Sequence, residues 1–81
     1  MSRVQVLYWQ DIPSVVKAGD VKRQLPDWFQ HEIDRVAMEQ GLAGSDAYLE
    51  QWEWRDHGEV DGSDAHAVDA VTAELSRRAG S

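Results

Sequence analysis

Cysteine is absent from this 81-residue sequence, and basic residues are scarce. Without cysteine the chain has no disulfide bond and no thiolate to act as a nucleophile or a metal ligand. Eight lysines and arginines stand against 15 aspartates and glutamates, which gives a formal net charge of −7. Because binding to nucleic acid and to anionic lipid both require a basic face, we expect neither as a partner.

Long apolar runs are also missing. No stretch approaches the roughly 20 residues that a membrane span needs. The first five residues, MSRVQ, lack the basic-then-apolar pattern of a signal peptide. We therefore expect a cytoplasmic protein. A chain of this length forms one domain, residues 1–81, with a thin core and little room for a deep active-site cavity.

Catalytic motifs are missing as well. The sequence contains no glycine-rich phosphate loop, and its serines do not occur in a nucleophile elbow. Carboxylates are abundant, but nothing indicates a cleft that would hold two of them in different environments, as acid–base catalysis requires. We predict no catalytic residues, no cofactor and no enzymatic activity of the chain by itself.

The first half of the chain predicts two strands and a helix. Residues Val4–Trp9 are rich in β-branched and aromatic side chains and predict a strand that is apolar on both faces. After a turn, residues 14–18 are expected to return antiparallel to it. A helix is predicted over 26–40, because Pro26 suits the first helical position, apolar residues recur at helical spacing, and Gly41 occupies the place of a left-handed C-cap.

The second half predicts a third strand and a second helix. Polar and aromatic residues alternate over 52–55, which favours a strand, although a short helix over 46–50 is an open alternative. Residues 57–62 are predicted to form a turn-rich acidic connector. Ser63 suits the N-cap of a helix over 64–78, with arginines in its last turn.

These elements follow in the order β-β-α-β-α and predict an α+β fold. The most economical arrangement is a small, mostly antiparallel three-stranded sheet with both helices on one face. The other face would then be exposed, and it would have to carry some of the tryptophans.

Four tryptophans are an excess for so short a chain. A thin core needs large side chains, and we expect this role above all for Trp52. Exposed tryptophans are natural interface anchors, and nearby basic residues could steer a partner toward them. The predicted partner-binding residues are Trp9, Trp28, Trp54, Lys22 and Arg23.

A second interpretation is a small-molecule or metal-binding module. In it the aromatic residues would stack on a ligand, and His57 with its acidic neighbours would ligate a metal. The spacing of these groups matches no established ligand pattern, and a solvated acidic loop is the commoner explanation. We therefore predict no metal-binding residues.

Three distinctive runs point to a known family. They are VQVLYWQDIP (4–13), LPDWFQ (25–30) and GSDAYLEQW (44–52). Together they resemble the bacterial "virulence factor" domain family, closely over about residues 3–55 and only loosely in the last helix. The family includes conserved virulence factor C, in which a similar segment accompanies a scaffold-like domain and helical repeats. That setting implies a role in protein assembly.

The resemblance also implies a class of partner. Stand-alone members of the family are often encoded near folate-dependent and corrinoid-dependent one-carbon enzymes. We therefore expect an accessory or scaffold subunit whose partner is a methylenetetrahydrofolate- or corrinoid-related enzyme. The family supplies no catalytic residues to carry over. Self-association remains open as well, because a small domain with a sticky sheet can pair with itself edge to edge.

Overall fold

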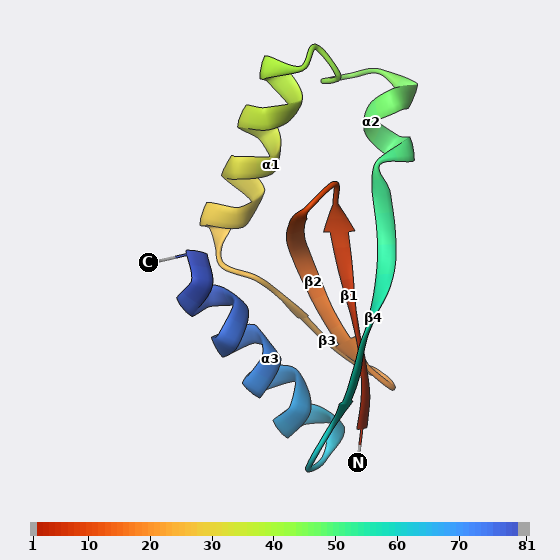
Figure 1. Cartoon of the computed structure of the whole chain (residues 1–81), viewed down its shortest axis with the longest axis vertical. Coiled ribbons are helices and arrows are strands. Elements are labelled where there is room, and N and C mark those ends of the chain that lie inside the picture. The colour runs from red at the N-terminus through yellow and green to blue at the C-terminus, as the bar shows by residue number, and fades with distance from the viewer. Residues whose placement is uncertain (1, 80–81) are drawn as a thin grey trace.

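A four-stranded antiparallel sheet with three helices makes up the fold (Figure 1). The computed structural model describes residues 2–79 of the chain. In chain order the elements are β1 (Ser2–Trp9), β2 (Ile12–Ala18), β3 (Val21–Gln24), α1 (Asp27–Glu39), α2 (Asp46–Glu50), β4 (Trp52–Val60) and α3 (Asp64–Ala79). The predicted α+β class is confirmed.

The strands lie in the order β3-β2-β1-β4, and every neighbouring pair is antiparallel. The register shifts between Leu7 and Tyr8 on the β2 side of β1, and between Val4 and Gln5 on its β4 side. α3 packs against β1, β2 and β3, and α1 packs against β2. Figure 1 places both helices on the same side of the strands, while α2 leads directly into β4. Within residues 2–79, no helix is long and apolar enough to cross a membrane.

The main core lies between the sheet and the two long helices. Alternate residues of β1 and β2 point toward α3, so Val4, Val6 and Val16 are almost completely buried. Burying a side chain of this size contributes about 1.5–3 kcal/mol. The full cluster is Val4, Val6, Val16, Ala18, Leu25, Phe29, Ala67, Val68, Val71 and Leu75.

A second, smaller cluster surrounds Trp9. This side chain is fully buried against Ile33 and Ala37 of α1. Its indole N–H donates a hydrogen bond to the backbone oxygen of Tyr48 in α2, at 2.9 Å, and the two rings lie 5.5 Å apart. The end of the β1–β2 hairpin is therefore covered by α1 and α2 together.

The predicted count of three strands and two helices is too low. β3 is a fourth strand, and it was missed because Lys22, Arg23 and Gln24 are polar and exposed and give no apolar alternation. α2 is a third helix and corresponds to the alternative weighed for residues 46–50. It is too short for a helical period to be evident in the sequence.

The predicted connector over 57–62 is wrong for most of its length. β4 continues to Val60, which pairs with Ser2. Gly58 adopts a φ of +101°, a conformation that other residues rarely adopt, at the shift in register. The strand therefore resumes its pairing beyond a glycine that predicted a turn. The two long helices agree with the predicted ranges to within one residue at each end.

Candidate protein-binding surfaces

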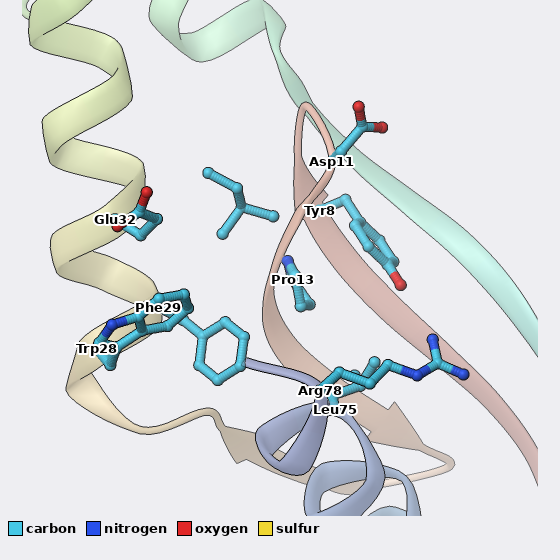
Figure 2. A pocket seen from close by; sticks show the side chains of 9 residues that line it. Tyr8, Asp11, Pro13, Trp28, Phe29, Glu32, Leu75 and Arg78 are labelled. Carbon is cyan, nitrogen blue, oxygen red and sulfur yellow. The ribbon is translucent and has the colours of Figure 1, made fainter. Parts of the chain in front are cut away.

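A pocket of about 280 Å³ opens between α1, the β1–β2 hairpin and α3 (Figure 2). Three segments that are far apart in the sequence supply its walls. Most of the lining is apolar or aromatic, and the charged side chains come one from each segment. The lining residues are Tyr8, Ile12, Pro13, Trp28, Phe29 and Leu75, with Asp11, Glu32 and Arg78 as the charged members.

Trp28 is the most exposed aromatic side chain of this pocket. It lies in the first turn of α1, one position before Phe29, whose ring is buried in the main core. The two rings meet edge to face with centroids 5.0 Å apart. The helix therefore holds the Trp28 ring firmly on one side while 51% of the residue stays exposed. A large apolar side chain that is both fixed and exposed is typical of an interface anchor.

The charged groups at the pocket are already in ion pairs or in water. Glu32 accepts a hydrogen bond from Arg35, which holds the pKa of Glu32 below its ordinary value of 4.5. The side chain of Asp11 is 97% exposed. Arg78 lies 2.8 Å from Glu74 of the same helix. The pocket therefore presents apolar and aromatic side chains with charged groups beside them.

The face of the sheet away from Val4 and Val6 carries a second surface, which is a row of apolar side chains ending at a tryptophan. Leu7 lies opposite Val15 on one neighbouring strand and opposite Trp54 on the other. Cross-strand partners share a face, so these three side chains form a row across β2, β1 and β4, here called the outer row. Trp54 is 45% exposed, and the ammonium group of Lys17 lies 5.7 Å from its ring centroid.

The four tryptophans differ in their burial. Trp28 and Trp54 are exposed, as expected of partner contacts, but they belong to separate surfaces, since only Trp28 lines the pocket. The prediction that Trp9 contacts a partner is corrected, because its side chain is fully buried in the second cluster. Trp52 is partly buried against that same cluster, which agrees with the core role expected of it.

The two predicted basic residues lie on β3 and line no part of the pocket. Lys22 is exposed and sits opposite Lys17. Arg23 is exposed too, but a nitrogen of its guanidinium group lies 2.5 Å from a carboxylate oxygen of Asp69 in α3. Arg23 therefore ties β3 to the helix.

Sequence reasoning missed most of the pocket. Tyr8 and Pro13 of the hairpin are distant along the chain from Leu75 of α3, and the three residues line one pocket only in the folded protein. His57, the centre of the metal-binding alternative, is exposed on β4. Over the described range 2–79, no three histidine, aspartate or glutamate side chains come together in a group that could hold a metal ion.

Comparison with known proteins decides the family. The family model described as "Virulence factor" matches residues 7–79. The chain belongs to the virulence factor family. The sequence of this virulence factor domain resembles the family closely only over about residues 3–55. The family model extends the match through α3. Searches of curated proteins and of solved structures each found no match.

Proposed function

We propose that this virulence factor domain is a non-catalytic accessory subunit that binds another protein by seating one of its apolar side chains in the pocket beside Trp28. The observation that supports this most is a half-exposed tryptophan fixed at an apolar pocket. Interface energy concentrates in a few such places, where an aromatic anchor meets a pocket that excludes water.

The size of the pocket favours a side chain over a cofactor. Sites for small molecules usually have volumes of roughly 300–1,000 Å³ and bury most of the ligand. This pocket has a volume of about 280 Å³, and its walls are the hairpin and two helices. It suits one leucine, methionine or phenylalanine side chain. A folate or a corrinoid is much larger than that. The alternative of a cofactor-binding module therefore has less support.

The negative charge of this chain favours a partner whose docking segment is basic. The chain carries a net charge of −7, and the carboxylates of Asp11 and Glu32 adjoin the pocket. A segment with an apolar anchor flanked by lysine or arginine would be attracted to this surface, and the attraction would speed association at low salt. We accordingly propose a basic segment of the partner as the part that docks.

The identity of the partner rests on the family. A folate-dependent or corrinoid-dependent one-carbon enzyme remains our proposed partner, because stand-alone members of the family are encoded near such enzymes. The domain would stabilise that enzyme or complete its site. Its basic docking segment would be the feature to look for in the sequence of any enzyme that co-purifies with the domain.

The direct test compares two exposed residues of the same helix. Trp28→Ala removes the anchor, whereas Met38→Ala removes an apolar side chain that is 71% exposed and does not line the pocket. For a partner that co-purifies from the native host, we expect Trp28→Ala to weaken binding about 30-fold, the loss typical of a hot-spot residue. Met38→Ala should bind like the wild type. Equal binding by all three proteins, each with an intact circular dichroism spectrum, would refute the assignment.

A separate measurement addresses the cofactor alternative. Trp28 lies in the pocket, so a ligand bound there would change the tryptophan fluorescence. We expect no change when folates or cobalamin are added. A saturable change that Trp28→Ala abolishes would favour the cofactor over the protein partner.

A further inference from the structure

β4 is an open edge of the sheet. It pairs with β1 on one side, and Figure 1 shows it along the margin of the molecule. It has nine residues, whereas the opposite edge strand, β3, has four. Residues 53–57 are all exposed, so helices cover neither face of this part of β4. Natural proteins usually shorten, cover or block such an edge, because it offers unpaired backbone groups to another strand.

The register shows which backbone groups are unpaired. From Trp9–Trp52 to Gln5–Asp56 the pairing of β1 with β4 is regular. One step before it, the N–H of Gln10 donates to the oxygen of Gln51, at 3.3 Å. Antiparallel ladders alternate between hydrogen-bonded and non-hydrogen-bonded pairs. Glu53 and Arg55 therefore bond to β1, and the backbone N–H and C=O groups of Trp52, Trp54 and Asp56 point away from the sheet.

The side chains of β4 are complementary to themselves in one register. If two copies pair antiparallel with Trp54 at the two-fold axis, Glu53 of each copy lies opposite Arg55 of the other. Opposite charges in such cross-strand positions stabilise a sheet. Both side chains are solvent-exposed, at 66% and 43%, and they lie 3.3 Å from each other, while Arg55 also lies 3.6 Å from Asp11. Two equivalent ion pairs would form.

Neighbouring registers lack this match. With the axis at Arg55, two arginines face each other. With the axis at Asp56, that residue faces itself and Glu53 faces Glu59 of the other copy. With the axis at Glu53, two glutamates meet. Like charges directly opposite destabilise a strand pair. Among these four registers, charge favours the one centred on Trp54.

The same register explains an exposed tryptophan. The outer row ends at Trp54, at the open edge of the sheet. In the Trp54-centred pair the two indole rings lie across from each other, and the outer rows of the two copies join into one apolar strip. Aromatic pairs in cross-strand positions add to the stability of a sheet beyond the area that they bury. The pairing would also make six backbone hydrogen bonds, from Trp52, Trp54 and Asp56 of each copy.

We propose that the partner of β4 is a second copy of this chain, joined by antiparallel pairing of β4 with β4 in the register that places Trp54 opposite Trp54 and Glu53 opposite Arg55. Two four-stranded sheets then form one sheet of eight strands. Few residues pair on each side, so the interface is small and the dimer is weak and transient. The inference does not depend on the pocket at Trp28.

Sedimentation equilibrium over a range of protein concentrations tests the dimer, and a charge swap tests its register. We expect Glu53→Arg to weaken the wild-type dimer about tenfold, since two attractive pairs become repulsive. The double variant Glu53→Arg with Arg55→Glu restores both pairs of opposite charges in the proposed register and should recover the wild-type constant to within about threefold. Trp28→Ala should dimerise normally, which separates this test from that of partner binding.

A second variant tests the same register without substituting Arg55, whose loss could unfold the monomer. Arg55 also lies over the ring of Tyr8, at 4.6 Å, and donates to the oxygen of Gln10, so its substitution could disturb the monomer. Because the chain has no cysteine, Trp54→Cys introduces a single thiol. Mild oxidation should then give a disulfide-linked dimer, and Leu49→Cys, at a residue that is 66% exposed in α2, should give far less. A wild-type protein that stays monomeric at every concentration, or a dimer indifferent to Glu53→Arg, would overturn the proposal.

Discussion

Trp9 and Trp54 show how one residue type takes opposite roles at similar positions. Each lies in a strand of the same sheet, β1 or its partner β4, yet Trp9 is fully buried and Trp54 is 45% exposed. The difference arises from the helices. α1 and α2 cover the end of β1, whereas residues 53–57 of β4 have neither face covered. Strand alternation assigns a side chain to a face, but which face a helix will cover is decided by contacts distant in sequence.

This difference predicts a large contrast in stability. Trp9→Ala should lower the free energy of unfolding by about 3–5 kcal/mol, because it leaves a cavity and removes the hydrogen bond to Tyr48. That is a large share of the roughly 5 kcal/mol expected for a small domain. Trp54→Ala should cost about 1 kcal/mol or less. Urea unfolding of dilute protein measures both, and similar losses in the two variants would contradict the assigned burial.

At the scale of elements, the sequence correctly predicts the helices in which apolar residues recur over many positions or capping residues mark the ends. α1 and α3 were predicted correctly because Pro26, Gly41 and Ser63 mark ends that the apolar spacing alone would leave vague. β3 was missed because an edge strand does not need an apolar face. The second half of β4 was mistaken for a turn because glycines and acidic residues usually interrupt strands. Here Gly58 provides a shift in register, and the pairing continues.

The exposed face of α1 carries a pH-sensitive ion pair. The hydrogen bond from Arg35 lowers the pKa of Glu32, so the ion pair stabilises the helix above the ordinary Glu pKa of 4.5, and this stabilisation is lost as the pH falls through the lower pKa of the folded protein. We expect an NMR titration of the Glu32 carboxyl group to show a midpoint below 4.5 that Arg35→Ala moves upward. A midpoint unaffected by Arg35→Ala would show that the pair does not form in solution.

At the scale of the whole molecule, the candidate site emerges only from the fold. Composition predicts exposed tryptophans and an acidic surface, and both are present. The pocket could not be predicted, because Tyr8, Trp28 and Leu75 meet through the packing of the hairpin and two helices. Their separation in the chain leaves no local motif. The same fold brings the β4 edge next to the pocket, because Arg55 of β4 lies over the ring of Tyr8, at 4.6 Å, and 3.6 Å from Asp11.

Hydrogen–deuterium exchange of the domain, alone and in complex with its co-purified partner, tests the central claim most directly. The account predicts slower exchange in the complex at the hairpin turn (10–14), the first half of α1 (27–33) and the end of α3 (75–78), which together surround the pocket. β3, on the far edge of the sheet, should exchange as it does in the free domain. Protection confined to β3 or to the outer row, with the pocket segments unchanged, would contradict the proposed mode of binding.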